Sequence, residues 1–78
     1  MPSDPLPDWV LASRRRVGDR VCAARAVRKI SQEKLGELTG LDRKTINRIE
    51  RGTYSTLLDH LILIARALDV SLADLVRD

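Results

Sequence analysis

The residues from Gln32 to Gly52 constrain the fold more than any other part of this 78-residue chain. They have the pattern of two short amphipathic helices joined at Gly40, which can adopt the positive φ that a tight turn requires. Ser31 and Asp42 stand where the N-caps of these helices belong, because their side-chain oxygens can accept from the first free backbone N–H groups. Gly52 stands where the second helix should end. The predicted helices are residues 32–39 and about 42–51.

The second of these helices has one apolar face and one polar, mostly cationic face. Ile46 and Ile49 are three residues apart and therefore share one side of the helix. The residues expected to project from the other side are Arg43, Lys44, Asn47, Arg48 and Arg51. A three-turn helix of this kind meets the requirements for insertion into the major groove of a DNA duplex.

Helical periodicity extends over most of the chain, without the alternation typical of strands and without internal repeats. A long helix is expected from about Trp9 to about Lys29, with Asp8 as its cap and Gly18 as a point that weakens or bends it. Two more helices are expected, at about residues 57–68 and 71–77, the last capped by Ser71. The sequence thus predicts an all-α fold with five helices.

The charge is unevenly distributed along the chain. The net charge is +3, but residues 13–52 hold twelve Lys and Arg against five Asp and Glu, whereas the remainder holds two against six. Basic charge is therefore concentrated on the part with the two-helix pattern, which favours a polyanionic partner. A solvated helical surface is the alternative reading of the same charges.

Several classes of protein are not expected from this sequence. Cys22 is the only cysteine, so no intramolecular disulfide is possible and a reducing compartment is indicated. We expect no signal peptide and no membrane span, because the longest apolar run, residues 57–70, is interrupted by charges. We also expect no enzyme, cofactor or metal site, since His60 has no second His or Cys at ligand spacing.

The sequence from Val17 to Val76 resembles the phage-repressor and Cro type of helix-turn-helix proteins, the Xre family. The residues that carry the resemblance are Arg25, Ser31-Gln32, Leu35-Gly36, Thr39-Gly40-Leu41, Ile46, Arg48-Ile49-Glu50-Arg51-Gly52, Ala65-Arg66-Ala67-Leu68, Val70-Ser71-Leu72 and Leu75. The resemblance implies a compact, lambda-repressor-like bundle of five helices, whose second and third helices contact DNA. We therefore expect a helix-turn-helix domain over residues 17–78, preceded by an extension over residues 1–16 that has a flexible lead (1–7) and the start of the first helix.

The resemblance also implies roles for individual residues. Arg25 and Glu50 match the ion pair that links the first and third helices, and Gly36 matches a small residue where the second and third helices cross. The residues that match DNA contacts are Gln32 at the start of the second helix; Asp42, Arg43, Lys44, Thr45, Asn47 and Arg48 in the third; and Arg51, Thr53, Tyr54 and Ser55 at its end. Arg43 and Lys44 are the main candidates for guanine recognition, with a phosphate contact as the alternative for Lys44. Asn47 is expected at adenine, at a phosphate or in solvent.

The chain departs from the family pattern in its fourth helix and in the loop before it. Thr56 stands where a proline is common. Apolar residues occupy more than one face: Leu57, Ile62, Leu63 and Ile64 accompany the expected core residues Leu58, Leu61, Ala65 and Leu68. We expect either the extension (Trp9, Val10, Leu11) or a second subunit to cover Leu57 and Leu63. A misjudged core face is the other explanation.

The function expected from these patterns is that of a sequence-specific, double-stranded DNA-binding transcriptional regulator. It would act in the cytoplasm, at the nucleoid, as a homodimer on half-sites about 34 Å apart. The dimer contact is expected either from the additional apolar residues of the fourth helix or from the fifth helix, through Leu72, Leu75 and Val76. The sequence does not choose between an antitoxin, a restriction-modification controller and a phage-type repressor. The alternative is a protein-interaction module, or an antitoxin-type protein with a small-protein partner, that keeps the fold.

Overall fold

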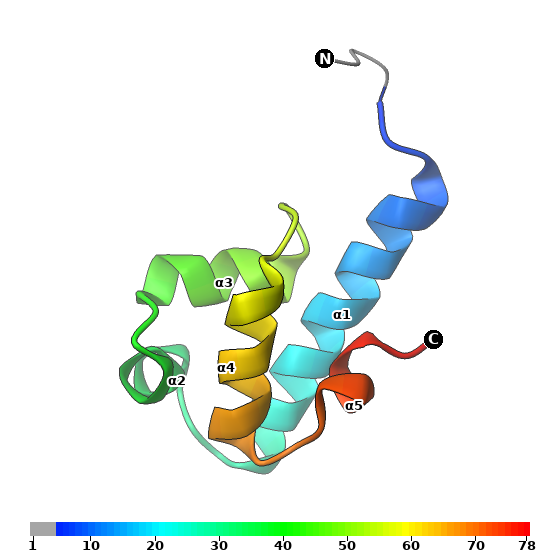
Figure 1. The fold of residues 1–78 in the computed structure, drawn as a ribbon. Coiled ribbons are helices and arrows are strands. Elements are labelled where there is room, and N and C mark those ends of the chain that lie inside the picture. The colour runs from blue at the N-terminus through cyan, green and yellow to red at the C-terminus, as the bar shows by residue number, and fades with distance from the viewer. Residues whose placement is uncertain (1–4) are drawn as a thin grey trace.

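The computed structural model describes residues 5–78, so residues 1–4 of the expected flexible lead lie outside the described part. The described residues form five helices and contain no strand, which confirms the all-α prediction. The helices are α1 (Asp8–Val27), α2 (Gln32–Thr39), α3 (Arg43–Arg51), α4 (Leu58–Leu68) and α5 (Leu72–Val76). The long α1 packs against α3, α4 and α5, and α2 lies on the far side of the bundle, beside α3 and α4 (Figure 1).

Side-chain caps define the start of the central helices, as the sequence predicts. The Ser31 hydroxyl accepts from the backbone N–H of Lys34 at 2.9 Å, and the Asp42 carboxylate accepts from the backbone N–H of Thr45 at 2.7 Å. Between the two helices, Gly40 has a φ of +79°, the left-handed conformation that the turn requires. These local interactions fix the angle between α2 and α3.

The predicted cap of the first helix is wrong. Asp8 is the first residue of α1, Pro7 precedes it, and no side chain caps the helix. The pyrrolidine ring of Pro7 holds its φ at −57°, which already leads the chain into the helix. The Asp8 carboxylate instead lies in the first turn, where it interacts favourably with the positive end of the helix dipole.

Every helix contributes to one apolar core. The side chains with almost no exposed surface are Val21 of α1, Leu35 of α2, Ile46 of α3, Ile64 and Leu68 of α4, and Leu75 of α5. Because the core is shared, each helix buries its apolar face against the other helices.

The predicted core face of α4 is partly wrong. Leu61, Ala65 and Leu68 are buried as expected, but Leu58 is 60% exposed, and Ile64, expected outside the core, is fully buried. Both Leu58 and Ile64 fit a helical spacing with Leu61 and Leu68, so periodicity alone does not separate them. Leu58 is the first residue of α4 and lies beyond the end of the core.

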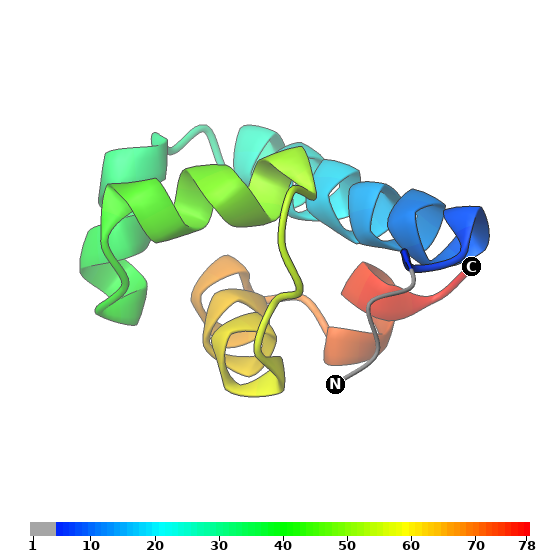
Figure 2. The same cartoon turned by 90° about the horizontal axis from the view of Figure 1, so that it is seen from above.

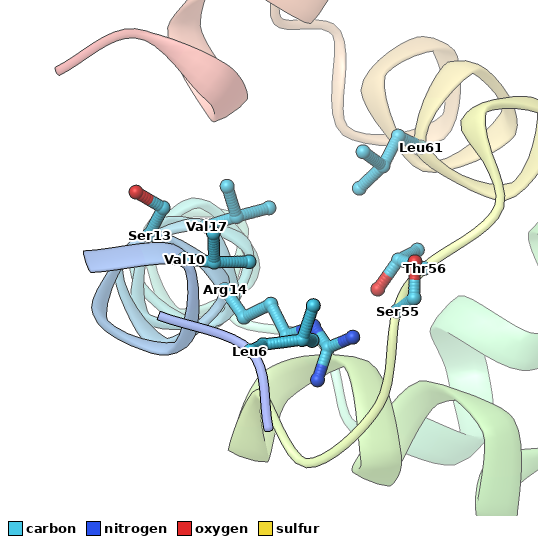
Figure 3. Close-up of a pocket in the computed structure, with 8 residues that line it drawn as sticks. All are labelled: Leu6, Val10, Ser13, Arg14, Val17, Ser55, Thr56 and Leu61. Carbon is cyan, nitrogen blue, oxygen red and sulfur yellow. The ribbon is translucent and has the colours of Figure 1, made fainter. Parts of the chain in front are cut away.

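The first turns of α1 do not cover Leu57 and Leu63, although the sequence offered this as one of the possibilities. Trp9 is 72% exposed, and Leu57 and Leu63 remain exposed as well. Instead, Leu6 and the first half of α1 face the α3–α4 loop and Leu61 across an open hollow of about 430 Å³ (Figure 3). The apolar side chains that α4 and its N-cap leave in solvent are Leu57, Leu58, Ile62 and Leu63, here called the α4 patch.

A glycine determines how closely α1 approaches α3. A Cβ atom on Gly18 would lie 2.5 Å from the carbonyl oxygen of Ile49 and 2.6 Å from that of Glu50, so any side chain would push the helices apart. The helix continues through Gly18 without a break. Gly36 is equally confined, because a Cβ atom there would lie 2.6 Å from the carbonyl oxygen of Leu41, in the turn before α3. Both glycines therefore bring backbone close to α3 or to the turn leading into it.

Within residues 5–78, none of the helices has the length and apolarity needed to cross a membrane.

Candidate nucleic-acid interface

The α3 helix presents its cationic side to solvent. Ile46 is fully buried and Ile49 is 5% exposed, so the apolar side of the helix faces the core. The side chains of α3 that lie in solvent include Arg43, Lys44, Arg48 and Arg51. Figure 2 shows α3 at the edge of the molecule, next to α1 and away from α5. The helix is therefore accessible along its polar side.

A buried ion pair attaches α3 to α1. The Nε and Nη2 atoms of Arg25 donate to the two carboxylate oxygens of Glu50 at 2.7 and 2.9 Å. The Glu50 side chain is only 5% exposed, and that of Arg25 is 18% exposed. The third Arg25 nitrogen, Nη1, donates to the carbonyl oxygen of Ile30 at 2.8 Å. The arginine thus joins the end of α1, the following turn and the last turn of α3.

Gln32 extends this network to the start of α2. Its Nε2 atom donates to Glu50 at 3.1 Å, and its Oε1 atom accepts from the Asn47 side chain at 3.5 Å. Gln32 and Asn47 are both half-buried, whereas Arg43 nearby is exposed. Two shallow depressions flank this corner, one lined by Arg25, Ser31, Gln32, Glu33 and Arg43, the other by Asp42, Arg43, Lys44 and Asn47. The first turn of α2 and the first half of α3 therefore form one continuous surface.

Hydrogen bonds shift the pKa values of two groups in this region. The hydrogen bond to the Glu50 carboxylate raises the pKa of Arg25 above its usual value. The backbone N–H of Thr45 lowers the pKa of the Asp42 carboxyl, because it stabilises the charged cap. Both pKa shifts favour the ionised form, so the Arg25 guanidinium and the Asp42 carboxylate are charged at neutral pH.

The loop after α3 folds back over the end of the helix. The guanidinium of Arg48 lies 5.1 Å from the centre of the Tyr54 ring, within the range of a cation–π contact. The Thr53 hydroxyl donates to the carbonyl oxygen of Arg48 at 3.5 Å. The left-handed Gly52, with a φ of +66°, reverses the chain and makes these contacts possible. Tyr54 and Arg48 are both predicted DNA contacts, but their contact with each other is not predicted by the sequence.

The structure divides the predicted contact residues between two parts of the surface, and Arg51 and Thr53 are exposed at the end of α3. Gln32, Arg43, Lys44 and Asn47 lie together at the start of α2 and α3. Thr45 is half-buried and lines a different depression, with Arg48, Tyr54, Ser55 and His60. Within residues 5–78, no three His, Cys, Asp or Glu side chains lie close enough together to hold a metal ion.

Two short helices at a fixed angle, with the second held by a buried ion pair and cationic on its free side, define a helix-turn-helix domain. A sequence profile described as helix-turn-helix matches residues 23–75, more than half of the chain. The chain belongs to the helix-turn-helix family, of the Xre and Cro type.

Two relatives by sequence are regulators or controllers. Control protein C.SmaI of Serratia marcescens is 35% identical over 60 residues, which cover 77% of this chain and 71% of the relative. The uncharacterized HTH-type transcriptional regulator y4dL of Sinorhizobium fredii is 44% identical over 50 residues, or 64% of this chain. The matched part spans only 26% of the length of y4dL.

Two solved structures have a similar fold. The restriction-modification controller protein C.AhdI from Aeromonas hydrophila is 34% identical, with a TM-score of 0.79 over 82% of this chain and 97% of that one. The P22 c2 repressor, solved in complex with a synthetic operator, is 30% identical, with a TM-score of 0.73 over 78% of this chain and 92% of the repressor. These similarities confirm the lambda-repressor-like type of bundle.

Proposed function

We propose that this helix-turn-helix protein is a sequence-specific transcriptional regulator that binds double-stranded DNA, with α3 in the major groove. The observation that carries the proposal is the orientation of α3, which buries both isoleucines and leaves Arg43, Lys44 and Arg48 in solvent. Packing of the bundle does not require these cations. They would serve a helix in the major groove, because Arg and Lys can donate to guanine O6 and N7.

The proposed contacts divide into base reading and positioning. Arg43 and Lys44, in the first turn of α3, are proposed to contact base edges. Gln32, at the positive N-terminus of α2, is proposed to contact a phosphate. Arg51 and the loop residues Thr53 to Ser55 are proposed to hold the sugar-phosphate backbone, which positions α3 without reading sequence.

A homodimer is the proposed binding form, with α4 rather than α5 at its interface, because Leu75 of α5 is buried in the core. The α4 patch is an exposed set of four large apolar side chains on a small domain, and such a patch marks a site of protein association. Two copies joined there would present two α3 helices to half-sites about one helical turn apart. The α4 patch also suits a different protein partner, which is the second candidate and would make the protein an interaction module.

The biological role that the relatives favour is control of a restriction-modification system. C.AhdI, a controller of this kind, has almost its whole length covered by this chain, and C.SmaI is also called a control protein. The antitoxin and phage-type roles have less support, although the P22 c2 repressor shares the fold. In the controller role the protein would act in the cytoplasm, at the nucleoid.

Selection of bound duplexes from a random pool tests the proposed function. We expect a recovered site with two half-sites related by a two-fold axis. Binding to this site should weaken linearly on a plot of log affinity against log salt concentration, because each phosphate contact releases counterions. Recovery of no sequence, together with affinity that salt does not change, would show that the domain is not a DNA-binding regulator.

Sedimentation of Leu63→Glu tests the proposed dimer. The substitution places a charge in the α4 patch and should convert the dimer to a monomer of unchanged helicity. Leu38→Glu is the matched control, because Leu38 is an exposed leucine of α2 outside the patch. A wild-type protein that sediments as a monomer at micromolar concentration would contradict the homodimer and favour a different partner.

A further inference from the structure

The first half of α1 contacts the C-terminal end of α3, at the residue that follows the helix. A Cβ atom on Gly52 would lie 2.8 Å from the Cα atom of Arg15 and 3.1 Å from the carbonyl carbon of Arg14. The backbones of α1 and of the α3 C-cap are therefore in direct contact. Figure 2 shows the end of α3 meeting α1, and α1 continuing beyond it along the same edge of the molecule.

Two arginines of α1 lie at this contact, and their side chains extend in different directions. Arg14 lines the hollow and extends its side chain toward the α3–α4 loop (Figure 3). Arg15 is exposed and does not line this hollow. Successive residues of an α-helix are rotated by about 100°. Gly18 faces α3. Around the helix axis, Val17 and Val21 lie on the core side of Gly18, and Arg15 lies about 60° from Gly18 in the other direction.

The side of α1 that carries Arg15 is thus the solvent side of the α1–α3 contact. Cys22 lies on the same side, two helical turns along α1, and is exposed as this geometry requires. The polar side of α3 is directed away from the core as well. A duplex lying against α3 and its C-terminal loop would therefore also meet the side of α1 that carries Arg15.

Neither Arg15 nor Arg51 forms an ion pair within residues 5–78. The ion pairs of the described residues join Arg16 to Asp78, Arg25 to Glu50 and Lys34 to Glu37. Asp19, one turn from Arg15 along α1, is exposed but makes no ion pair with it. Both arginines are exposed and have no carboxylate partner among the described residues, so each guanidinium is available to a phosphate.

We propose that Arg15 is an additional phosphate-binding residue, which extends the DNA interface from α3 onto α1. Its partner is the sugar-phosphate backbone of the bound duplex, at the strand that Arg51 also contacts. The proposal rests on the proposed DNA-binding function and adds a contact from outside the family match, which begins at residue 23. Such a contact increases affinity and salt dependence without reading sequence.

The variants that test this proposal are Arg15→Gln, Arg15→Lys and the control Arg20→Gln. Arg20 lies on the opposite side of α1, where it donates to the backbone carbonyl of Arg77. Arg15→Gln and Arg20→Gln change the net charge equally, so a difference between them reports a local contact. Circular dichroism melts establish that all three are folded, and the exposed Arg15 side chain leaves no gap in the core when it is replaced.

Affinity for the selected duplex is measured between about 50 and 200 mM salt. For Arg15→Gln, the slope of log affinity against log salt should become shallower by about 0.9 for each protomer bound. The ratio of wild-type affinity to Arg15→Gln affinity should fall by about 3.5-fold per protomer between these salt concentrations. The reason is that the variant makes one phosphate contact fewer, so a fourfold increase in salt weakens it less. Arg15→Lys should keep most of the wild-type slope, and Arg20→Gln should match it.

Ethylation interference locates the contact. At least one phosphate should weaken binding of the wild type when ethylated and have no effect on Arg15→Gln. If Arg15→Gln and Arg20→Gln behave alike at every salt concentration, α1 does not contact the DNA, although α3 still does. If the wild type itself shows no salt dependence, the proposed DNA-binding function fails, and this contact fails with it.

Discussion

Replacing Arg25 with Met should strongly destabilise the protein, because Arg25 is one partner of a buried ion pair. Arg25 makes two hydrogen bonds to the Glu50 carboxylate and one to the Ile30 carbonyl. Methionine fills a similar volume but leaves the carboxylate, whose side chain is 5% exposed, with Gln32 as its remaining donor. Removing one partner of a buried ion pair costs about 3–5 kcal/mol.

This cost is large compared with the stability of a small domain, which is about 5–15 kcal/mol. Urea unfolding at pH 7, followed by circular dichroism at 222 nm, measures it. The midpoint should fall sharply for Arg25→Met while the slope of free energy against urea stays the same. Arg16→Met is a matched control on the same helix, because the Arg16–Asp78 pair is exposed and screened by water.

A second substitution separates the ion pair from simple packing. In Arg25→Met/Glu50→Leu no buried charge remains, so most of the lost stability should return. Binding to the selected duplex should not return, because the Gln32 amide no longer has the Glu50 carboxylate as its acceptor and the orientation of α3 is less well fixed. Equal losses of stability in Arg25→Met and Arg16→Met would refute the reasoning, since they would show that Glu50 is accessible to water.

Three other substitutions give distinct outcomes. Gly18→Ala should lower the free energy of unfolding by about 1–3 kcal/mol in urea titrations, because its Cβ atom meets backbone oxygens of α3 that cannot move alone. The Asp42 cap stabilises the fold fully at pH values above the ordinary pKa of its carboxyl, and this contribution is lost as the pH falls through the lowered pKa of the folded state. The melting temperature of Asp42→Asn should therefore depend less on pH below pH 4 than that of the wild type. Tyr54→Ala should bind DNA more weakly than Tyr54→Phe by about 0.5–1 kcal/mol of binding free energy, because phenylalanine keeps the ring that contacts the Arg48 guanidinium. An unchanged free energy of unfolding would contradict the expectation for Gly18→Ala. The same pH dependence as the wild type would contradict the one for Asp42→Asn, and equal binding by the two Tyr54 variants would contradict the third.

The central part of the fold could be predicted from the sequence because local chemistry determines it. Ser31, Asp42 and Gly52 act on neighbouring backbone groups, so the positions of these residues alone define where α2 begins and where α3 begins and ends. The orientation of α3 was equally accessible, because Ile46 and Ile49 are its only large apolar residues. These features depend on interactions within a few residues.

The features that could not be predicted depend on contacts between distant residues. Leu58 and Ile64 are equivalent by periodicity, and only the packing of α4 on the other helices separates them. Gly18 resembles a helix defect in the sequence, because its role depends on carbonyl oxygens more than thirty residues away. The Arg48–Tyr54 contact depends on the path of the chain after Gly52. The individual roles proposed for the DNA-contacting residues remain predictions that binding experiments must test.

Base reading by α3 is tested by comparing Arg43→Ala with Arg51→Ala on the selected site and on variants with each base pair changed. Arg43→Ala should lose discrimination at one base pair of each half-site, at a cost of about 1–3 kcal/mol. Arg51→Ala should weaken binding to all duplexes by the same factor and reduce the salt dependence. If both variants weaken every duplex equally, α3 does not read bases through Arg43, and the central claim is contradicted.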